Sequence, residues 1–177
     1  MRDVKDPFRA AEAIRLLPKT SNLHLLHIGS ALTPREKRRA EREGRDNPRY
    51  TWVGEKPQWQ TIRLLARARL LVLTSLMEGG ANVVSEALAC SIPVISTHIS
   101  GSIGLLGPDY PGYFPVGDTK ALADLLLRAE QDPKFYKSLK TGIRFQRKIV
   151  HPRQETSSWR ALLKELQLNT VPPARPE

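Results

Sequence analysis

The sequence predicts an α/β fold of the doubly wound kind, in which helices cover both faces of a parallel sheet. Segments with strand character alternate with segments of helical periodicity, at intervals of about 20 to 25 residues. Residues 70–74 are short, apolar and partly β-branched, which is typical of a buried parallel strand. We expect one domain over residues 1–168 and a disordered, proline-rich tail over residues 169–177.

Capping residues and glycines delimit the elements of the first third of the chain. Asp6 and Pro7 are expected to cap a helix with an apolar face. Thr33-Pro34-Arg35-Glu36 is a capping box with proline at the first helical position, so a second helix begins there. Gly29 and Gly54 each stop an apolar run. The sequence therefore predicts helices over residues 7–17, 34–44 and 58–68, and strands over residues 22–28 and 50–53.

The rest of the chain continues the alternation. A helix is expected to follow the glycines after the strand at residues 70–74, and residues 100–104 are expected to form a glycine-rich loop. Asp118 is a helix cap and Pro133 a first helical residue. The remaining predicted elements are strands over residues 93–97 and 113–116, and helices over residues 119–128, from 133 onward, and 154–166.

The residues with chemical potential lie at the junction after the apolar strand. Glu78 stands at the carboxyl edge of that strand, where open α/β sheets bind ligands, and Glu86 follows on the first turns of the next helix. Gly79 and Gly80 let a ligand approach the backbone, and free N–H groups at the helix start favour a phosphate. On pattern alone, an alternative is equally good: Glu78 is a solvated loop residue, Asn82 an N-cap and Glu86 a surface residue.

The charge and composition argue against several classes of function. The formal net charge is +10, but residues 70–132, which hold the junction, carry 2 Lys and Arg against 7 Asp and Glu. Residues 1–69 carry 16 Lys and Arg against 8 Asp and Glu, and residues 133–177 carry 10 Lys and Arg against 3 Asp and Glu. Aromatic residues are 6% and do not alternate with the basic runs, so binding of nucleic acid is not favoured. The charged start and the lack of a long apolar run indicate a cytoplasmic protein.

A metal site or a cysteine nucleophile is not expected. Cys90 is the only cysteine, which excludes an internal disulfide, and its apolar neighbours favour a place in the core. The four histidines show no metal-ligand spacing with it.

The motif MEGGANVVSEALA, followed by Pro93-Val94-Ile95, resembles the E-x7-E signature of retaining GT-B glycosyltransferases of the family-4-like group. In that group the signature lies in the Rossmann-like, C-terminal domain that binds the sugar nucleotide. The chain also resembles the selenosugar synthases of selenoneine biosynthesis, in segments that cover most of residues 5–130: KDPFRAAEAIRLLP, NPRYTWVGE, MEGGANVVSEALA and ISGSIGLLGPDYPGYFPVGDT. This resemblance implies transfer of N-acetylglucosamine from UDP-N-acetylglucosamine to selenophosphate. The UDP-sugar is then a substrate, and no cofactor is implied.

The resemblance assigns roles to individual residues. Glu78 matches the acid near the donor sugar, the candidate catalytic residue, for which positioning is favoured over proton transfer. Glu86 matches the acid that holds the ribose hydroxyls. Lys5 matches the lysine that grips the donor diphosphate, with Arg2 as a weaker second cation, and fixed cations stabilise a leaving UDP. Further phosphate contacts are expected at Gly80, Ala81 and Asn82, and the loop beside the base at Val53, Gly54 and Glu55.

The chain departs from the wider glycosyltransferase pattern at several positions. An aromatic residue and a second glycine are replaced by Gly80 and Ala81, and an apolar residue by Asn82. The acid usually found after the next glycine loop is replaced by about Gly104. A selenophosphate nucleophile needs cations more than a general base, which suits a missing acid.

The resemblance covers only one of the two GT-B domains. In the family a full strand, central in the sheet, precedes the lysine matched by Lys5, whereas four residues precede it here. We therefore expect the first strand to be missing or reduced to a stub, a gap between the strands at residues 22–28 and 70–74, and an N-terminal GT-B domain or partner chain. Two alternatives remain: a non-catalytic UDP-sugar-binding module or subunit, and a basic nucleic-acid-binding domain.

Overall fold

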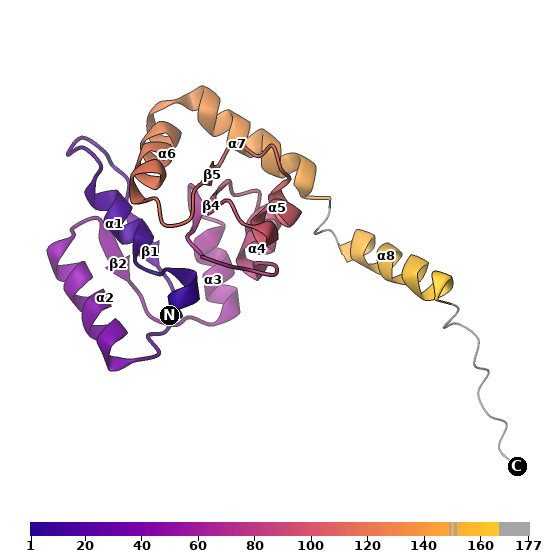
Figure 1. Ribbon diagram of the computed structural model, residues 1–177, viewed down its shortest axis with the longest axis horizontal. Coiled ribbons are helices and arrows are strands. Elements are labelled where there is room, and N and C mark those ends of the chain that lie inside the picture. Colours follow the sequence, from indigo (N-terminus) through magenta and orange to yellow (C-terminus); the bar gives the residue numbers. More distant parts are fainter. Residues whose placement is uncertain (149, 151, 167–177) are drawn as a thin grey trace, which may run out of the picture.

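The structure is a computed structural model that describes residues 1–148, 150 and 152–166 (Figure 1). The tail expected over residues 169–177 lies outside the described residues. Strands and helices alternate along the chain, and all strand pairs are parallel, so the predicted α/β class is confirmed. None of the helices in the described ranges is long and apolar enough to cross a membrane.

The strands form two parallel sheets. In one, Leu25 lies opposite Tyr50; in the other, Leu71 lies opposite Val94 and Ser96 opposite Tyr113. Each strand is shorter than the apolar run that predicts it. The first sheet has the order β1 (Leu25–His27), β2 (Tyr50–Trp52), and the second has the order β3 (Leu71–Leu73), β4 (Val94–Thr97), β5 (Tyr113–Phe114).

The expected gap between β1 and β3 is present, since no strand of the described residues pairs with both. The residues before it form a 3₁₀ turn, η1 (Asp3–Lys5), and not a strand stub. The Met1 ammonium group donates to the Ser30 carbonyl, after β1. The Leu76 N–H, after β3, donates to the Val4 carbonyl at 2.8 Å. The first residues therefore connect the two sheets at the carboxyl ends of their strands.

The helices begin where side chains satisfy their first N–H groups. Thr33 and Glu36 form the predicted capping box, and Asp118 accepts from the Ala121 N–H at 2.8 Å. The Asp132 carboxylate accepts from the N–H groups of the next helix start in the same way. The helices are α1 (Arg9–Arg15), α2 (Pro34–Asp46), α3 (Gln58–Leu65), α4 (Asn82–Cys90), α5 (Ser100–Leu106), α6 (Thr119–Gln131), α7 (Pro133–Gln146) and α8 (Pro152–Glu165).

Three local predictions are wrong. The helix after Asp6 begins only at Arg9, because the Asp6 backbone is left-handed (φ 42°) and its carboxylate pairs with the Arg9 side chain at 2.7 Å. Asn82 is not an N-cap but the first residue of α4, after Ala81. Residues 100–104 form the start of α5 and not a loop.

The core lies between the second sheet and its helices. All four residues of β4 are buried, and α6 packs against β4 and β5. Helix α1 packs mainly against α6 and adds its buried side to the same core, whereas α2 packs against the first sheet. Tyr110 is 5% exposed, and its hydroxyl both donates to the Val94 carbonyl and accepts from the Val94 N–H, at 2.8 and 3.0 Å. The largest fully buried apolar side chains are Phe114, Leu88, Ile95, Leu122, Leu139, Val84 and Val94.

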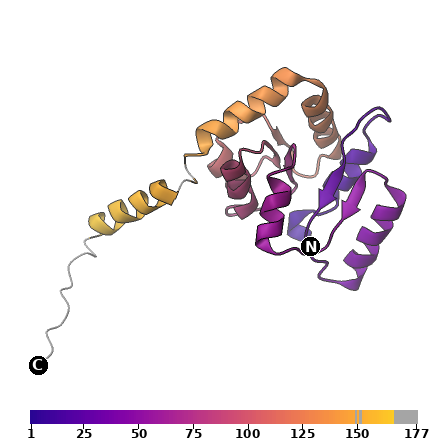
Figure 2. The ribbon, with the colours of Figure 1, turned by 180° about the vertical axis from the view of Figure 1, so that it is seen from behind.

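Figures 1 and 2 show the two halves side by side, with β1, β2, α1 and α2 on one side and β4, α4 and α5 on the other. Helix α6 lies next to α1, where the two halves meet. In both views α8 extends away from the body after the end of α7. The loops that follow β1, β2 and β3 lie at the carboxyl ends of the strands.

Candidate functional site

Glu78 is held in place by three segments of the chain. Its side chain is only 10% exposed, and it accepts hydrogen bonds from the Lys5 ammonium and from the Ser75 hydroxyl, the latter at 2.9 Å. Thr97, at the end of β4, donates to the Ser75 carbonyl at 2.7 Å and so fixes the segment that carries both residues. This burial and pairing do not fit the alternative in which Glu78 is a solvated loop residue.

The surroundings of Glu78 favour its ionised form. Burial raises its pKa, but the hydrogen bonds from Lys5 and Ser75 and the positive charges of Lys5 and Arg2 outweigh burial, so that the pKa lies below its ordinary value. A carboxylate that is ionised at neutral pH accepts hydrogen bonds and orients cations. The geometry therefore suits positioning and electrostatic work, and not the donation of a proton.

The loop between β3 and α4 is tightly packed on one side and open on the other. A Cβ atom on Gly101, in α5, would lie 2.3 Å from the Glu78 carbonyl oxygen, so only glycine allows α5 to approach this loop so closely. A Cβ atom on Gly79 or Gly80 would meet nothing within 4 Å. These two glycines thus leave open space beside the backbone, where a ligand can approach it.

The start of α4 has no side-chain cap among the described residues. The helix begins at Asn82, which is exposed, and its N-cap residue Ala81 offers no side-chain acceptor. Its first N–H groups are therefore available to an anion, which the helix dipole also favours. The sequence-predicted phosphate contacts at Gly80, Ala81 and Asn82 lie at this start.

Glu86 lies one helical turn further along α4 and is partly exposed. The Gln58 side-chain amide donates to its carboxylate at 3.4 Å, which is a long hydrogen bond between exposed groups. Gln58 begins α3, immediately after the loop that follows β2. The structure therefore brings Glu86 near the expected base-side loop, with carboxylate capacity left for a further donor.

The base-side loop of Val53, Gly54 and Glu55 is tied to the end of β1. The Val53 N–H donates to the His27 carbonyl at 3.0 Å, and the Gly29 N–H donates to the Gly54 carbonyl at 2.8 Å. Gly54 has φ 68°, which favours glycine, and Glu55 is exposed. The Trp52 indole N–H donates to the Gly29 carbonyl at 2.8 Å, so Trp52 has a role in joining these two loops.

Sequence reasoning missed three residues near this site: Ser75, Gln58 and His27. Ser75 directly follows an apolar strand, so its place at the carboxyl edge was a usable signal. His27 ends β1, its Nδ1 lies 2.7 Å from the Tyr50 hydroxyl, and burial, aided by the N-terminal charge, lowers its pKa to about 4. It is therefore a neutral side chain packed against the rings of Phe8 and Tyr50.

In the ranges that the structure describes, no three His, Cys, Asp or Glu side chains gather as a metal site requires. Cys90 is partly exposed and packs against the core. Two pockets of the described residues lie on α7 and include neither Glu78 nor Glu86 in their lining. The convergent polar groups lie instead at the strand ends, around Glu78.

A family model described as "Glycosyl transferases group 1" matches residues 1–144. Among curated proteins, the chain is 40% identical over 86 residues to the amylovoran biosynthesis glycosyltransferase AmsK of Erwinia amylovora, covering 45% of this chain and 21% of that protein. It is 32% identical over 83 residues to the N-acetyl-alpha-D-glucosaminyl L-malate synthase of Bacillus anthracis, covering 46% of this chain and 22% of that protein. The aligned segments thus span about a fifth of these relatives.

Solved structures confirm the fold class. The HepE protein of Anabaena, solved in complex with UDP and glucose, aligns with a TM-score of 0.70 at 19% identity, covering 91% of this chain and 46% of that chain. The sucrose-phosphate synthase of Thermosynechococcus elongatus aligns with a TM-score of 0.76 at 23% identity, covering 94% of this chain and 43% of that chain. The chain therefore matches less than half of each of these larger chains.

Proposed function

The chain belongs to the group 1 glycosyltransferases, and on this basis we propose that residues 1–168 form a donor domain that binds a UDP-sugar. The observation that carries the proposal is the arrangement at the strand ends. An ionised Glu78, paired with Lys5, lies beside an open glycine loop and an uncapped helix start, and Glu86 follows one turn later. The HepE protein, which has the same fold, was solved with UDP and with UDP-glucose.

Each group would have a separate part in holding the donor. The N–H groups at the start of α4 would bind the diphosphate, with charge from Lys5 and Arg2, and Glu86 would accept hydrogen bonds from the ribose hydroxyls. Lys5 is 41% exposed, so its ammonium group can contact a phosphate and Glu78 together. Glu78 would then orient Lys5 and contact the sugar. As UDP leaves, the fixed positive charges stabilise the negative charge that develops on its phosphate.

We further propose UDP-N-acetylglucosamine as the donor and selenophosphate as the acceptor. Four sequence segments support this through their resemblance to selenosugar synthases, and the name of the Bacillus anthracis relative includes the same sugar. In the reaction, the bond from the anomeric carbon to the UDP oxygen breaks, and UDP leaves with the electron pair. A carbon–selenium bond forms in its place. An anionic acceptor suits a site that carries the positive charges of Lys5 and Arg2.

The chain covers less than half of the HepE and sucrose-phosphate synthase chains. On this basis we propose that the acceptor is brought to Glu78 by an N-terminal GT-B domain or a partner chain, which would also exclude water. We propose the cytoplasm as the location of this activity.

Titration calorimetry with UDP and UDP-N-acetylglucosamine tests donor binding, with ADP as the control nucleotide. A one-to-one complex with UDP that is stronger than with ADP supports the proposal, whereas equal binding of both, or of neither, contradicts it. Release of UDP is then measured with selenophosphate and with phosphate, in the presence of the proposed N-terminal domain or partner chain. Binding of the UDP-sugar without any turnover would instead favour a non-catalytic UDP-sugar-binding module.

A further inference from the structure

The segment that carries Arg2 and Lys5 is attached to the body by hydrogen bonds rather than by packing. None of the residues of η1 is buried, and no strand of the described residues pairs with this segment. The Lys5 ammonium can reach Glu78 only while the backbone that carries it stays in place. The contacts that fix this backbone therefore decide where the cation lies.

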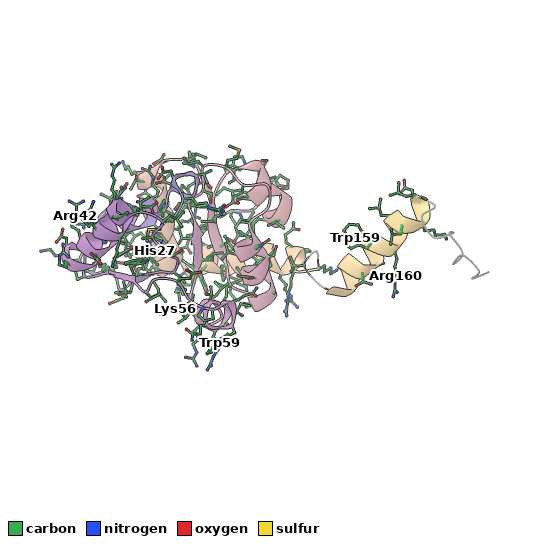
Figure 3. The ribbon with its side chains drawn as sticks, turned by 90° about the horizontal axis from the view of Figure 1, so that it is seen from below. His27, Arg42, Lys56, Trp59, Trp159 and Arg160 are labelled. Carbon is green, nitrogen blue, oxygen red and sulfur yellow. The ribbon has the colours of Figure 1, made fainter. Side chains whose placement is uncertain are left out.

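Two of these contacts hold the residues before Lys5. The Met1 ammonium donates to the Ser30 carbonyl, and the Leu76 N–H donates to the Val4 carbonyl at 2.8 Å. The end of β1 is a firm support for the first contact, because His27, its last residue, lies within the body (Figure 3). The segment is thus fixed on one side by the chain after β1 and on the other by the chain after β3.

The backbone of Lys5 itself is held by a side chain, that of Thr74. Thr74 directly follows β3 and is 8% exposed. Its hydroxyl oxygen lies 2.9 Å from the Lys5 carbonyl oxygen and 2.9 Å from the Asp6 carbonyl oxygen, so one proton is shared between two acceptors. No other group in the described part of the chain donates to the Lys5 carbonyl.

The conformation of Asp6 makes this hydrogen bond more important. Asp6 has φ 42°, and a left-handed backbone is uncommon for a residue other than glycine and persists only where its surroundings fix it. The Thr74 hydroxyl and the Arg9 N–H, at 3.2 Å, both donate to the Asp6 carbonyl. Loss of the hydroxyl would release the turn that directs Lys5 toward Glu78.

We propose that Thr74 is a positioning residue for the cation that binds the donor diphosphate. Its hydroxyl fixes the backbone of Lys5 and Asp6, so that the Lys5 ammonium lies where it can contact Glu78 and a phosphate together. Thr74 acts through Lys5, because its hydroxyl proton is already used by the two carbonyl groups. This assignment rests on the proposed function, since the diphosphate is the ligand proposed there for Lys5.

Two substitutions separate the hydroxyl of Thr74 from its shape: Thr74→Val keeps the shape, and Thr74→Ser keeps the donor. Burial raises the pKa of Glu78, and the hydrogen bond from Lys5 is the largest of the interactions that lower it. A ¹³C NMR titration of the Glu78 carboxyl group in the full chain therefore reports whether Lys5 is in place. Its midpoint should move to higher pH in Thr74→Val and stay near that of wild type in Thr74→Ser. An unchanged midpoint in Thr74→Val would overturn the proposal.

Tyr110→Phe is the matched control. It also removes a buried hydroxyl that is bonded to two backbone groups, but in the core. The variant should lose stability and keep the midpoint of Glu78. An equal shift of the midpoint in Tyr110→Phe and Thr74→Val would show that reduced stability alone moves it, which contradicts a specific role of Thr74.

NMR titrations with UDP and with uridine test the connection to the diphosphate. Uridine has the same base and ribose but no phosphate, so a displaced Lys5 should affect UDP alone. Thr74→Val should weaken UDP binding about tenfold and uridine binding by less than about twofold, and Thr74→Ser should restore UDP binding. Equal losses for both ligands would overturn the role toward the diphosphate. A wild type that does not bind UDP would refute the proposed function, whereas the Glu78 titration would still decide whether Thr74 positions Lys5.

Discussion

Replacing Lys5 by alanine tests the pairing that holds Glu78. The substitution leaves a carboxylate with 10% exposure and only the Ser75 hydroxyl as its donor. Breaking a fully buried charge pair costs about 3 to 5 kcal/mol, and an exposed pair contributes about 1 kcal/mol or less. Because the Lys5 side chain is 41% exposed, we expect an intermediate loss of about 1.5 to 2.5 kcal/mol in the free energy of unfolding. For a chain of this size the melting temperature should fall by about 3 to 10 °C.

Differential scanning calorimetry near neutral pH measures this loss. The control is Lys37→Ala on α2, which removes a 3.9 Å pair with Glu41 whose partners are 63% and 44% exposed. That variant should lose about 0.5 kcal/mol or less. Equal losses in the two variants would refute the reasoning that burial of Glu78 makes its pairing with Lys5 important.

The stability difference between wild type and the Lys5→Ala variant should depend on pH. The folded-state pKa of Glu78 lies below its ordinary value, so its contribution to stability is present above about pH 4.3 and is lost as the pH falls through the folded-state value. Removing Lys5 raises that pKa, because burial remains and the main opposing interaction is gone. The difference in stability between wild type and Lys5→Ala should therefore be constant at neutral pH and shrink on acidification. A difference that stays constant down to pH 3 would contradict this.

Three further variants test the site and its support. Glu86→Ala should weaken UDP binding by about 1.5 to 3 kcal/mol, the range for hydrogen bonds to a charged group, and calorimetry showing an affinity within about twofold of wild type would remove Glu86 from the site. Gly101→Ala should cost about 1 to 3 kcal/mol in urea unfolding, because its Cβ would clash with the Glu78 carbonyl. Gly104→Ala, in the same helix but facing open space, is its control and should not destabilise. Tyr110→Phe removes the hydroxyl bonded to both backbone groups of a β4 residue and should cost about 1 to 3 kcal/mol in the same assay.

The alternation of elements could be predicted because local signals define it. The Thr33 capping box and the Asp118 cap act within four residues of each helix start, so the sequence contains the whole interaction. The apolar run at residues 70–74 likewise predicts a buried strand without knowledge of its neighbours. Strand ends could not be predicted as well, because pairing partners determine where a strand stops.

The remaining features depend on contacts between distant segments. Lys5 and Glu78 are 73 positions apart, so spacing alone does not predict their ion pair. Considered only for its local flexibility, Gly101 predicts a loop. In the structure it lies in α5, and its lack of a side chain lets α5 contact the Glu78 backbone. Asp6 has the right type and spacing for a helix cap, yet its carboxylate is used by Arg9.

The most direct test of donor binding is an NMR titration of the uniformly ¹⁵N-labelled chain with UDP. If the strand ends and the start of α4 bind the nucleotide, the amide signals of Gly80, Ala81, Asn82 and Glu86 should shift together, with smaller changes at Val53 to Glu55. Signals of α7, which lies at the other end of α4, should stay in place. Shifts confined to Lys137, Lys140 and Arg144, or no shifts at saturating UDP, would contradict the proposal that this chain is a UDP-sugar-binding domain.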